Sequence, residues 1–193
     1  MAMAEIPDFT NEGLLPPGDC EVTLDELRES VLLVGPRDTA ARPNWDTPWR
    51  RHLVDSLEVL VGQLWRVGIT EIFVDGSFAE DKDHPNDIDG YFVCDLMRLA
   101  TGDLQREQNL LDPHKVWTWD PASRRVYRGY PKRQLPMWHQ YRVELYPHFR
   151  GLLSGIRDEY GNELDFPSAF RRSRRDGKPR GIVKIRKPGG GNP

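Results

Sequence analysis

The sequence has little cysteine, no long apolar run and almost no net charge. Its two cysteines, Cys20 and Cys94, are too few for a disulfide framework, and Cys94 lies in an apolar run where a reduced thiol is expected. Nowhere do the roughly 18 consecutive apolar residues of a membrane span occur, and residues 1–13 lack the basic and apolar regions of a signal peptide. We therefore expect a cytoplasmic protein that does not enter a membrane.

The charge balance gives no overall field. The formal net charge is −3, from 27 basic and 30 acidic residues, so total charge neither favours nor excludes a nucleic-acid partner. The five histidines lack zinc-site spacing. At 193 residues with 38% hydrophobic residues, the chain can bury one substantial core but is short for two ordinary domains. We predict a single domain over residues 1–193, with an extended arm at 1–22 and a basic segment at 171–193.

Helix signals are clearest in the first third of the chain. Thr23 and Glu26 have the spacing of a capping box, in which each side chain satisfies a free N–H group at a helix start. Apolar residues then recur at helical spacing from Leu53 to Trp65. The predicted helices span about residues 24–33, 53–65 (preceded by a cap at Thr47-Pro48 and closed by Gly68), 95–111 (weakened by Gly102) and 149–160.

Strand signals are short runs rich in β-branched and aromatic residues. The predicted strands span about residues 69–74, 87–94, 140–146 and 181–185. Two further runs, 116–119 and 125–128, flank the turn at 120–123 and predict a β-hairpin. The aromatic residues Trp117, Trp119, Trp138 and Tyr141 either belong to the core or stack on a nucleobase.

The stretch 72–94 combines a phosphate-binding pattern with a pair of carboxylates. Gly76 permits a tight turn, and the N–H groups after it, with the Ser77 hydroxyl, can donate to phosphate oxygens. Asp87 and Asp89 lie on one face of the next predicted strand, where they can bind Mg²⁺ together with substrate phosphates. Lys82, in the intervening loop, could reach a phosphate. The alternatives are a simple turn, two loop acids and a solvated lysine.

The carboxylate pair is distinguished by its context. Asp19/Glu21, Asp81/Asp83 and Glu163/Asp165 have the same spacing, in a chain that is 30% charged. Only Asp87/Asp89 opens a predicted strand and follows a strand that ends in Gly-Ser. Phosphoryl and nucleotidyl transfer require mainly positioning and charge neutralisation, which this arrangement can supply.

At these residues the chain resembles the polymerase-beta-type nucleotidyltransferase superfamily, whose signature is Gly-Ser, a short spacer and two aspartates one residue apart. The resemblance implies an α/β (α+β) core, a short mixed sheet with helices mainly on one side. It also implies that Gly76 and Ser77 hold a nucleoside triphosphate and that Asp87 and Asp89 bind Mg²⁺, or Mn²⁺ in its place. The matching third carboxylate, Glu144, would bind the metal and assist the acceptor hydroxyl; alternatively it forms a surface ion pair with Arg142.

A narrower resemblance covers nearly the whole chain. The segments that carry it are Ile6–Phe9, Gly13–Gly18, Gly76–Asp89 and Gly177–Val183. Together they are similar to a family of small bacterial nucleotidyltransferase-like proteins of unknown function, which implies no particular substrate.

The function implied by these resemblances is Mg²⁺-dependent transfer of a nucleoside monophosphate from an NTP to a hydroxyl of RNA, protein or a small molecule. One alternative is a non-catalytic nucleotide-binding regulatory module. Another is a toxin–antitoxin or phage-defence component that modifies tRNA. The basic residues of 171–187 could contact RNA or DNA phosphates, or could form a solvated end before Gly189–Gly191.

Overall fold

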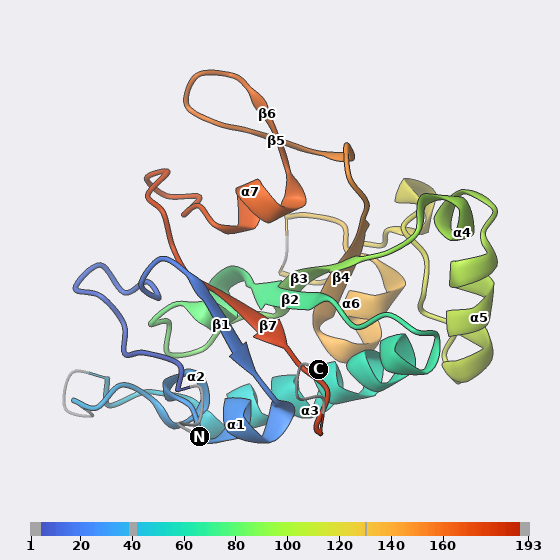
Figure 1. The fold of residues 1–193 in the computed structure, drawn as a ribbon. Coiled ribbons are helices and arrows are strands. Elements are labelled where there is room, and N and C mark those ends of the chain that lie inside the picture. The colour runs from blue at the N-terminus through green and yellow to red at the C-terminus, as the bar shows by residue number, and fades with distance from the viewer. Residues whose placement is uncertain (1–4, 39–41, 130, 190–193) are drawn as a thin grey trace.

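The computed structural model describes residues 5–38, 42–129 and 131–189 (Figure 1). Its strands are β1 (Asp19–Val22), β2 (Ile72–Asp75), β3 (Ile88–Val93), β4 (Val143–His148), β5 (Leu153–Arg157), β6 (Glu163–Asp165) and β7 (Ile182–Ile185). Its helices are α1 (Leu24–Arg28), α2 (Val31–Val34), α3 (Thr47–Arg66), α4 (Leu96–Ala100), α5 (Asp103–Leu111), α6 (Pro136–Tyr141) and α7 (Phe166–Phe170), with 3-10 turns η2 (Gly76–Ala79) and η3 (Pro121–Ser123).

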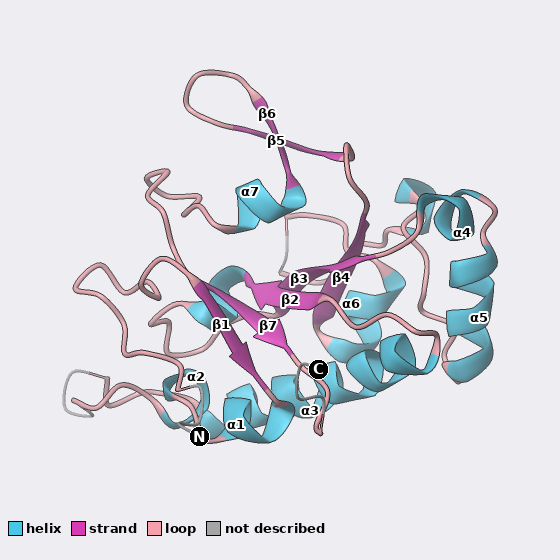
Figure 2. Ribbon diagram, in the orientation of Figure 1, coloured by secondary structure: helices cyan, strands magenta, loops and turns pink. Residues whose placement is uncertain are grey.

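The main sheet has five strands in the order β1-β7-β2-β3-β4, and β5 pairs with β6 separately. β1 is parallel to β7 and β3 is parallel to β4, whereas β2 is antiparallel to both of its neighbours. Helices α1, α3 and α6 lie on one side of this sheet, and α7 lies on the other with the β5–β6 sheet (Figure 2). The α/β (α+β) class with a short mixed sheet is therefore confirmed.

Helix α3 forms because its ends and its buried face are both specified. Asp46, one residue before the predicted cap, accepts a hydrogen bond from the Trp49 N–H at 3.0 Å, and Pro48 occupies the first turn, where its missing donor costs nothing. The apolar stripe from Leu53 to Leu64 is buried against the sheet side of the core. Gly68, at φ +83°, ends the helix as predicted.

Alternation along β3 divides the core between the two faces of the sheet. Ile88 and Phe92 belong to the main apolar cluster, with α3. Tyr91 points to the other face, where it packs with Phe73 and Phe170. This confirms the predicted alternation, although the strand begins at Ile88 and Asp87 immediately precedes it.

The predicted hairpin at 116–128 is wrong. Residues 116–119 form no strand, and a single bridge joins Arg125 to Gln134 beyond the η3 turn. Trp117 is fully buried, and its indole N–H donates to the Gln63 side chain at 2.6 Å. The aromatic residues that suggested a strand at 116–119 therefore pack into the core from an irregular segment, because apolar side chains can be buried without strand pairing.

Glycine and left-handed backbone account for most of the other differences in the elements. The predicted helix at 149–160 is instead strand β5 followed by a turn, with Gly151 and Gly155 at positive φ. Gly102, at φ +76°, divides the predicted helix 95–111 into α4 and α5. The predicted strand 140–146 begins only at Val143, because α6 precedes it and ends at Arg142, φ +55°. The predicted helix 24–33 is also divided, at Ser30.

The first and last strands of the described chain, β1 and β7, are both part of the main sheet. Residues 19–22 of the predicted arm form β1, and Ile6, Leu14 and Leu15 are buried; residues 1–4 lie outside the described residues. The predicted strand at 181–185 is confirmed as β7, which lies between β1 and β2. Residues 190–193, which include Gly190 and Gly191 of the predicted flexible end, also lie outside the described residues.

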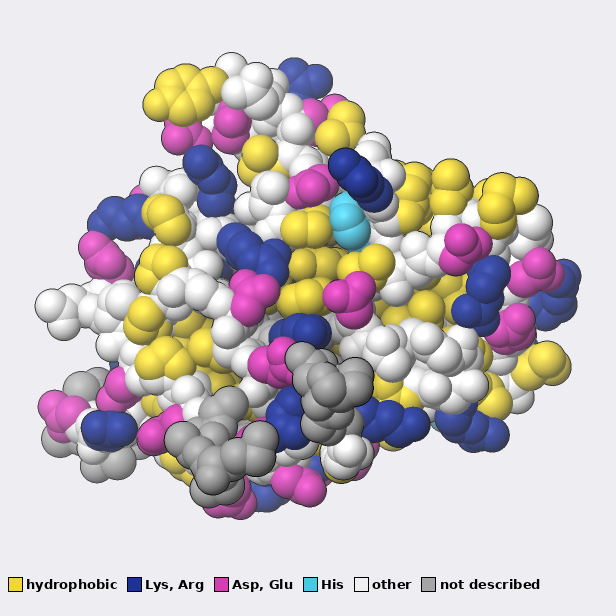
Figure 3. All heavy atoms as spheres, in the orientation of Figure 1, with side chains coloured by type: hydrophobic (Ala, Val, Ile, Leu, Met, Phe, Trp, Pro, Cys, Tyr) yellow, Lys and Arg dark blue, Asp and Glu magenta, His cyan; other side chains and the backbone are white. Residues whose placement is uncertain are grey.

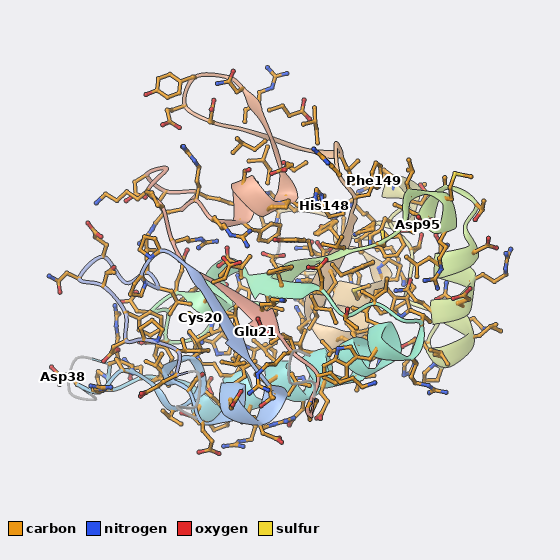
Figure 4. All side chains as sticks on the ribbon, viewed as in Figure 1. Cys20, Glu21, Asp38, Asp95, His148 and Phe149 are labelled. Carbon is orange, nitrogen blue, oxygen red and sulfur yellow. The ribbon has the colours of Figure 1, made fainter. Side chains whose placement is uncertain are left out.

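The two cysteines are not joined in a disulfide. Cys20 lies on β1 (Figure 4), and Cys94 follows β3. Burial raises the pKa of the Cys94 thiol to about 11. Among the described residues, no helix has the length and apolar character needed to cross a membrane.

Candidate functional site

A pocket of about 800 Å³ opens where β2, β3 and β4 meet the loop that follows β2. Its lining includes all six residues predicted from the sequence: Gly76, Ser77, Lys82, Asp87, Asp89 and Glu144. It also includes five further cations (Arg124, Lys132, Arg174, Arg175 and Arg180) and the rings of Tyr146, Phe166 and Phe170. The pocket therefore has carboxylates among a larger number of positive charges.

Gly76 and Asp89 lie in close contact across the β2–β3 pair. Asp75 and Asp89 are partners in the antiparallel register, so the η2 turn begins beside the Asp89 carboxylate. Gly76 has φ +76°, and a Cβ on it would lie 2.9 Å from Asp89 Oδ2. Both facts require glycine here. They explain in physical terms why a Gly-Ser turn and a downstream aspartate occur together.

Asp87 and Asp89 are held near one another at the pocket wall. Burial raises the pKa of Asp89 to about 7, and the charge of Asp87 acts in the same direction. Burial also raises the pKa of Asp87, while the Trp138 indole N–H, donating to its Oδ2 at 2.7 Å, opposes that rise. Within the described residues no donor bonds to the Asp89 carboxylate. Two such carboxylates, each destabilised as an anion, fit a divalent cation that also binds substrate phosphates.

Glu144 lies beside Asp89, but its carboxylate is already engaged. The parallel register of β3 and β4 pairs the two residues, and the charge of Glu144 contributes to the raised pKa of Asp89. Glu144 Oε1 accepts from the Leu135 N–H at 2.9 Å, Oε2 accepts from the Tyr146 hydroxyl, and Arg124 lies 3.6 Å away. In the described part of the chain, no group of three or more acids, histidines or cysteines is arranged to hold a metal ion.

The alternative ion pair between Arg142 and Glu144 is wrong. Arg142 lies before β4, in left-handed backbone, and its guanidinium packs over the rings of Trp138 at 3.9 Å and Tyr127 at 4.2 Å. Trp117, Trp138 and Tyr141 are buried, and Trp119 packs against the core. The base-stacking interpretation of these four residues therefore has no support in the structure.

A buried ion pair beneath the pocket was missed by the sequence analysis. Asp75 is completely buried, and Arg180 donates to its Oδ2 at 2.5 Å. Arg180 also donates to Glu80 at 2.5 Å, so one guanidinium joins β2 to the loop after η2. Burial raises the pKa of Asp75 well above its usual range. Asp75 is recognisable beside Gly-Ser, but Arg180 is one of many basic residues and gives no local signal.

Arg50 is a second missed residue, and it holds the loop that carries Lys82. Its fully buried guanidinium donates to four main-chain oxygens, those of Leu32 (2.7 Å), Phe78 (2.8 Å), Glu80 (3.1 Å) and Lys82 (2.6 Å). Burial lowers the pKa of Arg50 to about 9. Its signal in the sequence was an arginine at the spacing of the apolar stripe of α3.

The basic segment is mostly neutralised by nearby acids. Its ion pairs join Arg171 to Asp19, Arg172 to Glu159, Lys178 to Glu12, Lys184 to Glu21 and Arg186 to Glu26. The face drawn in Figure 3 shows acidic and basic side chains interspersed accordingly. Arg174 and Arg175 differ, because they are exposed and line the pocket. The segment is therefore not the solvated end that one interpretation predicted.

Comparison with known proteins identifies a family but no described function. A family model described as a family of unknown function, DUF6932, matches residues 7–186. The matched range extends from the N-terminal arm to the residue after β7 and contains every pocket residue named above. No curated protein and no solved structure shows significant similarity to the chain.

Proposed function

We propose that this chain, which belongs to the DUF6932 family of unknown function, is a Mg²⁺-dependent nucleotidyltransferase. The reaction would move a nucleoside monophosphate from an NTP to a hydroxyl acceptor. The observation that supports it most is the contact between the Gly76 turn and Asp89, with Asp87 close by, inside a pocket that is otherwise rich in cations. A triphosphate with a divalent cation has the complementary charges.

The phosphate-binding role is assigned to residues on one side of the pocket. Ser77 can donate its hydroxyl hydrogen to a phosphate oxygen, and the N–H groups after Gly76 can do the same. Lys82 and Arg174 lie close enough to the carboxylates to influence them, since both oppose the raised pKa of Asp87. When bound between Asp87 and Asp89, Mg²⁺ supplies positive charge to the phosphates.

In the proposed reaction the acceptor oxygen forms a bond to the α-phosphorus, the bond from that phosphorus to the bridging oxygen breaks, and pyrophosphate leaves. The proton of the acceptor hydroxyl must pass to a base. Asp87 and Asp89 would be engaged as metal ligands, so the base would be a neighbouring carboxylate, and Glu144 is paired with Asp89 in the β3–β4 register. Glu144, which the superfamily resemblance assigns to the acceptor, already accepts one hydrogen bond at each oxygen, from Leu135 and from Tyr146, so only the second lone pair of each oxygen is left for this role.

The engaged carboxylate of Glu144 also favours a second candidate, a nucleotide-binding module without turnover. Such a module would keep the phosphate side of the pocket, while Glu144 serves only to hold Tyr146 and Leu135 in place. Calorimetry with Mg-ATP and the other three NTPs distinguishes the candidates. Tight binding that survives Asp87→Asn, with no transfer, would favour the module.

The proposed transfer is tested with α-labelled NTPs, one at a time, with Mg²⁺ and total RNA or cellular protein. We expect label to enter one acceptor pool, to require metal and to be lost in Asp89→Asn. Glu21→Gln is a matched control, because it removes one carboxylate charge from the exposed β1 pair with Lys184 and leaves the pocket intact. Absence of both NTP binding and transfer in the unaltered protein would exclude the proposal.

A further inference from the structure

A basic loop forms part of the pocket rim. We define the rim loop as residues 124–129 and 131–134, which lie between η3 and α6 in the chain. In Figure 1 the loop is the pale yellow trace that lies between the ribbons of α7 and α6. It contains five cations, Arg124, Arg125, Arg128, Lys132 and Arg133, and no acidic residue. Arg124 and Lys132 line the pocket.

The rim loop differs from the basic C-terminal segment in having unneutralised charge. Arg125, Arg128, Lys132 and Arg133 are exposed, and no acid in the described part of the chain forms an ion pair with them. Arg124 alone is engaged, by the Tyr146 hydroxyl and Glu144. A solvated basic face would have the same composition. The rim loop is distinguished by its position, because two of its cations, Arg124 and Lys132, line the pocket itself.

Cations from two other segments complete the rim. Arg174 and Arg175, after α7, and Lys82, after η2, also line the pocket. Positive charge from three separate segments thus surrounds the carboxylates at the centre. A chain of phosphates lying on the rim loop would meet these cations at the pocket that contains the carboxylates.

Two aromatic rings could receive bases beside this path. Tyr127, in the rim loop, is 38% exposed, although the Arg142 guanidinium lies over its ring at 4.2 Å and the Trp138 ring stands edge-on to it at 5.1 Å. Phe166 lines the pocket and stacks on Tyr146 at 5.4 Å. Partly exposed rings beside a cationic track are the features with which proteins bind single strands. Bases in a duplex stack on each other and are not available to such rings.

We propose that the rim loop binds single-stranded nucleic acid and directs a terminal hydroxyl of the strand toward Asp89. The binding step stands on the loop itself, whereas the role of the hydroxyl as acceptor rests on the proposed nucleotidyl transfer. An acidic peptide is disfavoured because it lacks bases for Tyr127 and Phe166. Nucleic-acid contact would thus be made by the rim loop and not by the C-terminal segment, whose charges are mostly paired.

The test is fluorescence anisotropy of the full chain with labelled 15-mers of RNA and of DNA, at several salt concentrations, without NTP or Mg²⁺. The variant is Arg125→Ala/Arg128→Ala/Arg133→Ala, which leaves the pocket lining intact. The control, Arg172→Ala/Lys184→Ala/Lys187→Ala, removes equal charge from the C-terminal segment. Since each phosphate contact contributes about 0.7 to the salt slope of a single strand, the variant should lower the slope by about 2 and weaken binding about tenfold or more at low salt.

Three outcomes would overturn the proposal: no binding of either 15-mer, equal loss in the control, or equal binding of poly-glutamate. Stronger binding of the RNA 15-mer or of the DNA 15-mer shows which kind of strand the loop prefers. Failure of the proposed transfer can be distinguished from failure of strand binding. Asp89→Asn should abolish transfer, whereas it should leave strand binding unchanged. Circular dichroism of both triple variants checks that each is folded.

Discussion

Two opposing electrostatic effects act on the protonation state of the Asp89 carboxylate. It lies in β3, where register places it next to Asp75 and Glu144. Three carboxylates in adjacent strands repel one another, and only Asp75 is matched by a buried arginine. The free protein therefore favours a protonated Asp89 up to about pH 7, whereas a bound cation would favour the ionised form.

This conflict predicts an unusual pH dependence of stability. The folded pKa of Asp89, about 7, exceeds the ordinary unfolded value of about 3.9. Between these values the folded state holds a proton that the unfolded state has released, so the contribution to stability is complete below about pH 4 and is lost as pH rises through 7. Asp89→Asn should therefore be more stable than the unaltered protein at pH 8, by about 1–3 kcal/mol after allowance for solvent screening.

The measurement is urea unfolding at pH 5 and pH 8 in the presence of a chelator, for the unaltered protein, Asp89→Asn and Glu21→Gln. The difference between Asp89→Asn and the unaltered protein should be larger at pH 8. Glu21→Gln should follow the unaltered protein at both values. A constant difference across this range would show that Asp89 is already ionised in the free protein.

Gly76 is predicted to be sensitive for two separable reasons. Gly76 and Gly102 both have φ +76°, but a Cβ on Gly102 would meet nothing within 4 Å. Each alanine variant should lose about 1–2 kcal/mol for the left-handed backbone. Gly76→Ala should lose more, because its Cβ would press on the Asp89 carboxylate, and it should also weaken NTP binding. Chemical denaturation and NTP titration of both variants test this; equal stability losses would exclude the contact as a cause.

At the scale of elements, one arginine of α3 controls the shape of the loop that leads from β2 to β3. Arg50 satisfies the main-chain oxygens of Phe78, Glu80 and Lys82, which face inward from an irregular loop. Such oxygens cost free energy when they are buried without a donor. The loop geometry around Ser77 and Lys82 thus depends on a helix that does not contribute to the pocket.

Arg50→Met should lower the free energy of unfolding by about 3 kcal/mol or more, because it leaves several buried oxygens without donors. Arg51→Met, the neighbouring and exposed position, should change stability by less than about 0.5 kcal/mol. NTP affinity measured by calorimetry should fall only in the Arg50 variant. If both variants bind NTP as the unaltered protein does, the loop does not need this arginine.

Local signals predicted part of this architecture, and their limits are physical. The α3 helix, the β2–β3 strands and five of the pocket residues follow from capping, periodicity and close sequence spacing, whereas Glu144 was assigned only through the superfamily resemblance. Arg50 and Arg180 could not be assigned, because their partners are distant in the chain and depend on tertiary packing. The 116–128 segment was misread because Trp117 has high strand propensity but satisfies its burial and its indole N–H in an irregular conformation.

At the scale of the whole molecule, the five-stranded sheet is completed by β7, the last strand of the described chain. β7 lies between β1 and β2, so it joins the N-terminal strand to the strands that carry the pocket. The segment just before it supplies Arg174, Arg175 and Arg180 to the pocket. Residues from both halves of the chain are therefore required for one site.

A chain that ends at Arg180 should lack β7 and fail to unfold cooperatively, because β1 loses its partner and β2 loses one of its two neighbours. A chain that ends at Lys187 keeps β7 and should melt like the unaltered protein. Thermal unfolding followed by circular dichroism distinguishes these outcomes. A sharp transition in the shorter chain would mean that β2, β3 and β4 form an independent unit.

The parallel pairing of β1 with β7 also has a consequence for how the protein is made. Residues 19–22 must wait for residues 182–185 before they can find their partners, and such distant pairing slows folding because the chain between must first be closed into a loop. During synthesis β1 and one edge of β2 would stay uncovered until nearly all of the described chain has left the ribosome. The pocket, which takes Arg180 from the residues just before β7, would then be among the last parts to form.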